Sequence, residues 1–340
     1  MFKEYIGWRG VIAFAAIACV LLFIHVNNHA LQMFALSEVW RAEFFETAGA
    51  RIGDVMTLTL SILVEALPFV VLGVLISVLI QVYLPTEKLL HKLPKNPFLR
   101  RLIISCFGFL LPVCECGNVP VARGLIAKGL SAEEAIIFLL TAPSVNIITF
   151  IVTWEAFAQN QSMAIVRVVA TIIIANITAL LVAKIVAKNK ILTPEFTAYC
   201  KAEPTRKQSL PRATNLFRNE MWLITRLLVI GALIAALFQV FVPTEVVAAI
   251  SGNIALSVLA MLALAFIISI CSSVDAFFAL AYAGTFGMGS LLAFLVAGPM
   301  VDIKMIALMK STFTARTIAV ITGSVLVLTF IVGVIFSYVW

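Results

Sequence analysis

Charged residues and histidine are scarce in this sequence. Charged residues make up 12% of the 340 residues, and histidine occurs three times. Hydrophobic residues make up 62%, and the mean hydropathy is +1.10, which lies outside the range of soluble domains. The sequence contains no Gly-x-x-x-x-Gly-Lys-Ser/Thr motif, so it has no nucleotide-binding P-loop that could serve as an energy source. This composition predicts an all-α polytopic membrane protein without a soluble domain.

Cysteine is infrequent, and its distribution argues against a disulfide framework. None of the cysteines lies in a loop that the charge pattern places outside, where disulfides persist. The net charge of +7 comes from basic residues in short loops between apolar runs, which is the positive-inside pattern. We therefore expect the lipid bilayer and a small molecule or ion as partners, and no nucleic acid. The six cysteines are Cys19, Cys106, Cys114, Cys116, Cys200 and Cys271.

Several apolar runs have about the length of a transmembrane helix, which needs roughly 20 residues. The first run has no small-residue cleavage site after it, so we interpret it as a retained N-terminal span and not as a signal peptide. Residues 28–54 resemble an amphipathic helix on the outer surface, and a lid or a packing segment is an equal alternative. The uninterrupted runs are residues 10–26, 55–84, 135–153, 164–187, 221–242, 288–301 and 317–339.

The chain contains an internal repeat. Residues 71–87 align with residues 229–245, and 10 of the 17 positions are identical. With nearly the same offset, Cys114 aligns with Cys271 and Asn118 with Asp275. We therefore divide the chain into an N-terminal span with its surface segment (1–49), a first repeat (50–188), a basic linker (189–218) and a second repeat (219–340).

Basic residues predict the orientation of the two repeats. If every apolar run crossed the membrane, the many Lys and Arg residues of 184–218 would face outside, against the positive-inside rule. If residues 102–127 form a re-entrant hairpin, that linker becomes cytoplasmic, together with Lys304, Lys310 and Arg316. The corresponding element, 254–284, stays undecided because its longer arm could nearly cross.

One hairpin in each repeat gives two inverted repeats whose broken helices meet at the midplane, as in many secondary transporters. This arrangement predicts a multi-pass protein of the bacterial inner membrane. Its N-terminus and the linker are cytoplasmic, and its C-terminus is outside. We read the linker, which has three prolines and many charges, as a flexible tether.

The polar residues at the two breaks are the candidate site. Cys114 and Cys116 form a Cys-x-Cys pair in a turn between two prolines, and Cys271 is the matching residue of the second repeat. Thiolates select soft ions such as Cu(I), Zn²⁺ or trivalent arsenic, so these three cysteines are candidate metal ligands. The alternative is that they are small residues tolerated in apolar helices.

Acids and amides extend this candidate site. A carboxylate within an apolar run costs about 2.5 kcal/mol or more unless it is paired, solvated or protonated, so such acids usually line a pathway. For Asn146 and Asp302, helix capping beside a proline is an equal interpretation. The residues predicted to contact substrate are Cys114, Glu115, Cys116, Asn118, Asn146, Cys271, Ser273, Asp275 and Asp302.

Three further charged residues lie near or within apolar runs. Glu65 lies deep in its run and has no acidic counterpart in the second repeat, so it is the candidate carboxylate for coupling to a proton gradient. Arg167 and Arg316 begin the last run of each repeat. A structural anchor is the favoured role for both, and substrate binding is the alternative.

The motifs also resemble a known family, the predicted permeases that include the organoarsenical efflux permease ArsP and the YraQ-type proteins. The resemblance implies a two-repeat membrane fold over roughly residues 50–340. In the arsenical branch it implies export of trivalent arsenicals through cysteines. The motif forms are more similar to a branch with no assigned substrate. They are Pro112-Val-Cys114-Glu-Cys116-Gly117-Asn-Val-Pro120, Arg123-Gly124-Leu, Lys128-Gly129 and Ala142-Pro143-Ser-Val-Asn146.

We therefore predict a gradient-driven secondary transporter that moves a small, thiophilic cargo by alternating access. The cargo would be a soft metal or metalloid species, an organoarsenical or a sulfur compound. We expect no enzymatic activity and no cofactor, and a homodimer is a candidate assembly. The alternatives are a membrane subunit of a larger assembly and an intramembrane thiol-redox protein, although a redox pair normally has two intervening residues.

Overall fold

The computed structural model describes residues 49–83, 94, 96–110, 114–187, 190–202, 210–241, 253–272 and 274–339. The predicted span 10–26, most of the predicted surface helix 28–54, Cys19 and Ser273 lie outside these residues. Within them, the regular structure is helical apart from one isolated β-bridge between Leu192 and Phe313. The chain is therefore an all-α polytopic membrane protein, as the composition predicts.

Five helical segments among the described residues are long and apolar enough to cross a bilayer. Four are the helices α2 (Gly49–Tyr83), α9 (Ser162–Ile185), α11 (Leu210–Phe241) and α17 (Ala315–Val339), and the fifth is Met288–Met309. Pro68 lies inside α2 without ending it, which is common in membrane helices because neighbouring groups satisfy the freed backbone.

The two predicted polar breaks are present. In the first, α4 (Pro97–Ser105) and α5 (Phe107–Leu110) precede α6 (Glu115–Ala127). In the second, α13 (Ile254–Ile268) ends at Ser269, whose φ of 53° is left-handed, and α14 (Asp275–Ala281) follows. A left-handed residue stops a helix sharply, so the backbone leaves the helical path at Ser269. At the first break, Cys114 is extended, with ψ of 175°.

Two runs predicted to be uninterrupted, 135–153 and 288–301, lead into two further breaks. Helix α7 (Ala132–Thr141) is followed by α8 (Ile147–Ala156), and α15 (Met288–Met300) by α16 (Ile303–Met309). The Asn146 side chain accepts a hydrogen bond from the Ile148 amide, and Asp302 accepts one from the Met305 amide. The capping interpretation of Asn146 and Asp302 is thus present in the structure.

The first broken element enters and leaves on one face of the protein. Arg100, near the start of α4, pairs with Glu134 at 2.5 Å, and Glu134 belongs to the capping box that begins α7. The neighbouring Arg101 lies 3.6 Å from Glu133. Because α7 follows α6 directly, these ion pairs place the entrance of the element beside its exit. This is the geometry of a re-entrant hairpin.

The linker between the predicted repeats is not a flexible tether over residues 190–202. These residues include α10 (Pro194–Ala202), and Tyr199 of this helix donates a hydrogen bond to Gln81 at 2.5 Å. The Thr193 amide donates to the Thr312 carbonyl at 3.0 Å, and the Thr314 amide to the Ile191 carbonyl at 3.1 Å. We call the face that holds these contacts the linker face.

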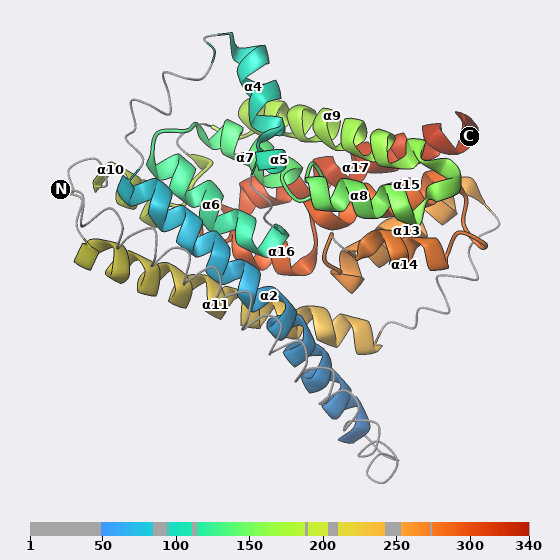
Figure 1. The fold of residues 1–340 in the computed structure, drawn as a ribbon, viewed down its shortest axis with the longest axis horizontal. Coiled ribbons are helices and arrows are strands. Elements are labelled where there is room, and N and C mark those ends of the chain that lie inside the picture. The colour runs from blue at the N-terminus through green and yellow to red at the C-terminus, as the bar shows by residue number, and fades with distance from the viewer. Residues whose placement is uncertain are drawn as a thin grey trace, which may run out of the picture. The chain divides into compact units, whose positions relative to one another are not determined.

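Helices α9 and α17 lie side by side and run in opposite directions (Figure 1). The chain leaves α9 at the linker face, and α17 begins there at residues bonded to Ile191. Gly333 lies about 27 Å along α17 from its start, at 1.5 Å per residue. A Cβ on Gly333 would lie 3.0 Å from Val258 of α13 and 3.1 Å from the Gly289 carbonyl of α15. The starts of α13 and α15 are therefore at the opposite face.

The second broken element also begins and ends at one face of the protein. Helix α14 is joined to α15 by the short connection 282–287, so its end stays near the opposite face where α13 begins. This placement favours a re-entrant course for 254–284, which stays a prediction.

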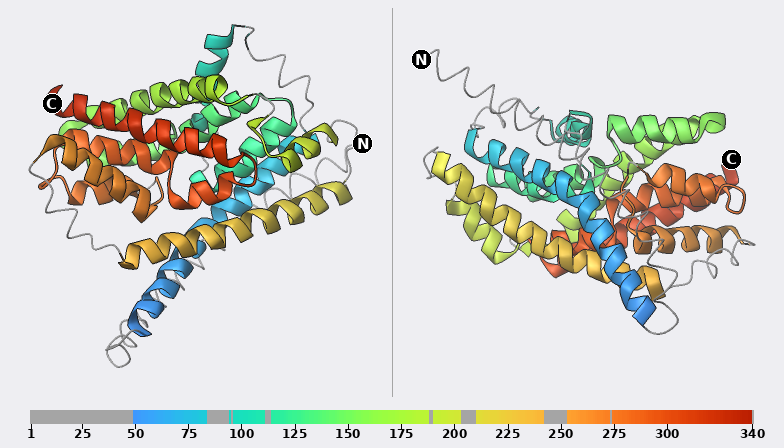
Figure 2. Two further views of the ribbon diagram at one scale, coloured as in Figure 1. Left: turned by 180° about the vertical axis from the view of Figure 1, so that it is seen from behind. Right: turned by 60° about the horizontal axis from the view of Figure 1, so that its bottom comes forward.

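Close packing holds the broken elements against the long helices. A Cβ on Gly73 of α2 would lie 2.3 Å from the Gly117 carbonyl of α6, and one on Gly124 would lie 2.8 Å from the Ser77 hydroxyl. Small residues at such crossings allow two backbones to approach, which is how membrane helices associate. On the other side, α11 packs along α16 and reaches α6 (Figure 2).

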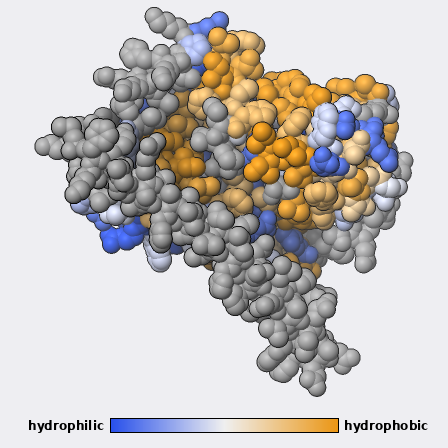
Figure 3. Space-filling model, viewed as in Figure 1, coloured by the Kyte–Doolittle hydropathy of each residue, from blue (hydrophilic) through white to orange (hydrophobic). Residues whose placement is uncertain are grey.

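The surface around α8 and α9 is apolar (Figure 3). Exposed isoleucines on this surface include Ile151 of α8 and Ile165 and Ile173 of α9, each about half exposed. An apolar surface around a buried polar interior is the expected pattern for a protein in a lipid bilayer.

Candidate functional site

The two polar breaks bring residues from both predicted repeats together. The Cys114 and Cys271 sulfurs and a Glu115 carboxylate oxygen all lie within 4.8 Å of one another. The three side chains are buried, with 9%, 6% and 2% of their surface exposed. We call these three residues the sulfur site. Cys114 and Cys271 are far apart in the sequence, and they meet because both broken helices place their cysteines at the same position in the interior.

Local structure explains how Cys114 is presented. It is the N-cap of α6, and its side chain makes no capping hydrogen bond. The thiol instead interacts with those of Cys116 and Cys271.

Lys304 compensates the buried carboxylates beside the sulfur site. Its ammonium lies 3.7 Å from Glu115 and 3.7 Å from Asp302, and it donates a hydrogen bond to the Ser269 carbonyl. The sequence analysis placed Lys304 in the cytoplasm with Lys310 and Arg316. That placement is wrong because α16 buries Lys304 to 4% exposure, whereas Arg316 is exposed.

Several buried polar atoms around Lys304 have no hydrogen-bond partner within the described residues. They include Oε2 of Glu115, Oδ2 of Asp302 and the hydroxyl of Ser269. Burying a polar atom without a partner is costly. Such atoms gathered at one place can accept further hydrogen bonds from water or from a ligand.

Asp275 has a partner that the sequence did not reveal. It accepts hydrogen bonds from both terminal nitrogens of Arg167, at 3.0 and 2.5 Å, and Arg167 also donates to the Thr153 hydroxyl at 2.8 Å. Both charged side chains are buried, Arg167 to 1% exposure. The anchoring role expected for Arg167 agrees with this contact, but the partner lies 108 residues away and carried no local signal.

The two predicted amides are occupied by structural contacts. Asn118 is fully buried and donates to the Leu139 carbonyl at 2.8 Å, while its own carbonyl oxygen has no partner within the described residues. Asn146 caps α8. A substrate contact by Asn118, Asn146, Asp275 or Asp302 stays a prediction, and Ser273 is outside the described residues.

A second charged centre, which the sequence analysis missed, lies at the linker face. Arg123 of α6 donates to Glu220 of α11 at 3.1 Å and to the Ser311 carbonyl at 2.5 Å. Its guanidinium also lies 4.4 Å from the centre of the Phe196 ring of α10. In the sequence, Arg123 was noted only as part of the Arg123-Gly124-Leu motif, so neither its partner nor its role could be predicted from spacing.

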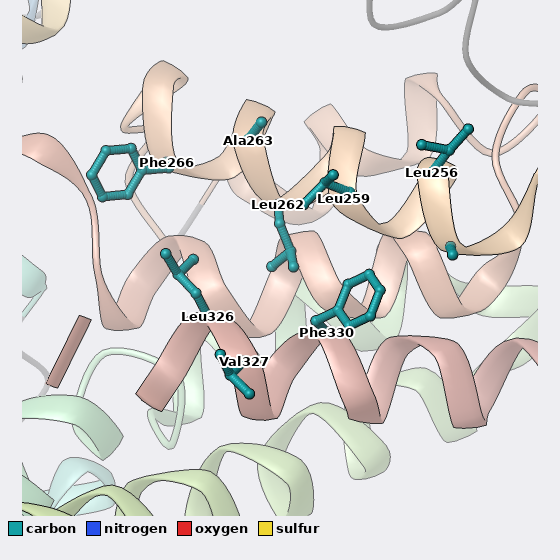
Figure 4. Close-up of a pocket in the computed structure, with 9 residues that line it drawn as sticks. Leu256, Leu259, Leu262, Ala263, Phe266, Leu326, Val327 and Phe330 are labelled. Atoms are coloured by element: carbon teal, nitrogen blue, oxygen red, sulfur yellow. The ribbon is translucent and has the colours of Figure 1, made fainter. Parts of the chain in front are cut away.

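Glu65 is exposed on α2, so it is not part of the buried sulfur site. Its role in coupling stays a prediction. The groove between α13 and α17 also lies apart from the charged residues. Its volume is about 530 Å³, and its lining is apolar, with Leu259, Phe266 and Phe330 among the side chains (Figure 4). Such a lining offers nothing to hold a polar cargo.

Comparison with known proteins places these features in a family. Residues 51–338 match the ArsP_1 family, described as "Predicted permease". The UPF0718 protein YcgR of Bacillus subtilis is 35% identical over 291 residues, which cover 83% of this chain and 99% of YcgR. A protein of Streptococcus mutans named "Putative two-component membrane permease complex subunit" is 35% identical over 285 residues, covering 82% of this chain and 95% of that protein.

A more distant relative is the UPF0718 protein YraQ of Escherichia coli. It is 24% identical over 266 residues, which cover 77% of this chain and 75% of YraQ. No solved structure gives a significant match to this chain.

Proposed function

Because the chain belongs to the ArsP_1 family of predicted permeases, we propose that it is a secondary transporter that carries a thiophilic cargo through the sulfur site by alternating access. The observation that carries this proposal is the convergence of Cys114, Glu115 and Cys271 within 4.8 Å in the buried interior.

The contacts between broken helices support the inverted repeats that alternating access uses. Helix α6 of the first repeat contacts α16 of the second, and α14 of the second contacts α8 of the first. These are equivalent pairs under the predicted repeat, since α6 corresponds to α14 and α8 to α16. Substrate sites of many secondary transporters lie where such broken helices meet.

The donor set favours a soft cargo. Two sulfurs and one carboxylate suit a thiophilic ion or metalloid, because thiolate is a soft ligand. Cys116 lies beside Cys114 and completes the predicted three-cysteine set. Lys304 reduces the net negative charge at the site, because its ammonium lies near Glu115. A cation would therefore be held mainly by the sulfur ligands and less by charge.

The test is transport into vesicles by the purified protein, with Cu(I), Zn²⁺ and trivalent phenylarsenical supplied separately. We expect Cys114→Ser, Cys116→Ser and Cys271→Ser to lower transport of the accepted cargo at least about tenfold, because a hydroxyl is a poor ligand for soft ions. The matched control is Cys106→Ser. This variant should transport normally, because Cys106 is exposed and lies outside the sulfur site.

The same assay tests coupling. With a pH gradient imposed, Glu65→Gln should still bind cargo but lose the acceleration that the gradient gives to the parent protein. Unchanged gradient dependence in Glu65→Gln would leave that carboxylate with a structural role.

For the cargo test, unchanged transport in all three serine variants of the site would exclude the soft-ligand mechanism.

A second candidate function is the membrane subunit of a two-component permease. It is favoured by the name of the Streptococcus mutans relative. In that case the protein alone should not transport cargo. Co-expression with its partner subunit should restore transport in the same vesicles.

A further inference from the structure

Three buried ion pairs among the described residues share one property, whereas a fourth, Lys304–Asp302, lies within residues 219–340. Arg123–Glu220, Arg167–Asp275 and Glu115–Lys304 each join a residue of 50–188 to a residue of 219–340. The Arg100–Glu134 and Arg101–Glu133 pairs lie within the first segment and are more exposed. Buried ion pairs contribute little net stability compared with apolar packing, but they fix geometry. Here they join the two segments.

Two of these pairs lie on opposite sides of the sulfur site. Arg123 follows Cys114 by nine residues of α6, which is about 13 Å, and it contacts Ser311 and Thr312 at the linker face. Arg167 lies about 27 Å along α9 from its linker-face end at Ile185, and its partner Asp275 is one helical turn beyond Cys271.

The sulfur site between them is buried. Its three side chains are 9% exposed or less. On the linker side, Arg123 and Glu220 line a cavity of about 550 Å³ whose other walls include Tyr199, Asn215 and Asn219. The Arg123–Glu220 contact therefore lies in the wall of a cavity large enough for a small cargo.

We propose that the Arg123–Glu220 and Arg167–Asp275 ion pairs are the two gates of the transport pathway, the first on the linker side and the second on the opposite side. Opening one gate means separating the two segments at that pair while the other pair stays formed. Phe196 and Ser311 hold Arg123 in place, so the linker helix α10 belongs to the first gate. The use of these gates rests on the proposed transport function, but their test does not need the cargo.

The test measures the access of the native site thiols to a membrane-impermeant maleimide. Cys19, Cys106 and Cys200 are first replaced by serine, and labelling of Cys114 and Cys271 is followed by mass spectrometry in vesicles of either orientation. Glu220→Gln should raise labelling from the linker side about tenfold or more, because it removes the charge that holds Arg123. Asp275→Asn should do the same only from the opposite side.

Two milder substitutions keep the test valid if the charge variants fail to fold. Thr312→Val removes one acceptor of Arg123, and Thr153→Val removes one acceptor of Arg167. Each should raise labelling from its own side by about fivefold, the effect of one lost hydrogen bond. Equal increases from both sides, or no increase in any of the four variants, would overturn the gates. Side-selective labelling with normal transport by the serine variants would instead retain the gates and reject the soft cargo.

Discussion

Lys304 is the residue on which the buried charges beside the sulfur site depend. Glu115 and Asp302 are 2% and 1% exposed, and among the described residues Lys304 is the cation within 4 Å of both. A carboxylate that loses its buried partner keeps the full cost of desolvation. The pairing therefore explains how two acids are tolerated inside an apolar protein.

We expect Lys304→Met to lower stability by about 3 to 5 kcal/mol, the cost of leaving a buried charge unpaired. Thermal unfolding in detergent would show this as a lower Tm. The double variant Lys304→Met with Glu115→Gln should recover part of the loss, because the unpaired charge at Glu115 is gone. A double variant less stable than Lys304→Met would show that Lys304 acts by packing and not by charge.

At the scale of elements, the crossing of α2 and α6 positions the first break. Gly117 lies three residues after Cys114, and a Cβ on it would be 2.7 Å from the Phe69 carbonyl of α2. With Gly73 opposite, the two backbones meet where no larger residue fits. The crossing thus sets how deeply α6 and the cysteine at its N-cap lie in the protein.

Gly73→Ala should destabilise the protein by about 1 to 3 kcal/mol or more, because the added methyl group meets backbone that cannot move aside. The matched control is Gly323→Ala in α17, where a Cβ has nothing within 4 Å and the change should be neutral or stabilising by about 0.5 to 1 kcal/mol. Equal Tm shifts in the two variants would contradict the close crossing.

At the scale of the whole molecule, the two faces defined by the contacts predict the topology. The linker face holds α10 and the start of α17, and the connection between α8 and α9, which includes η1 (Ala158–Asn160), lies at the far end of α9. The excess of Lys and Arg in the linker then predicts that the linker face is cytoplasmic.

This topology can be measured with one introduced cysteine at each face. Lys201 and Gln159 are both exposed. In a background without exposed cysteines, Lys201→Cys should react with an impermeant maleimide only in inverted vesicles, and Gln159→Cys only in intact cells. Strong labelling of Lys201→Cys in intact cells would reverse the orientation.

The sequence determined the class of the protein and the position of its interruptions. Apolar runs of spanning length require helices, because a bilayer leaves backbone groups no other partners. Prolines and polar residues at 112–120 and 270–275 marked two breaks where the structure has them. The breaks at 142–146 and 301–302 had a weaker signal, because capping by Asn146 and Asp302 beside a proline was only one of two interpretations and the surrounding runs are apolar.

Only the tertiary structure decided which charged residues meet. The repeat alignment matches equivalent positions, not residues in contact. It matches Cys114 with Cys271, Glu115 with Ser272 and Lys304 with Ile148. The contacts observed instead join Glu115 to Lys304 and Arg167 to Asp275. Sequence spacing determines which residues share a helix, whereas an ion pair depends on the docking of helices more than 100 residues apart, and that is set by the packing of the whole chain.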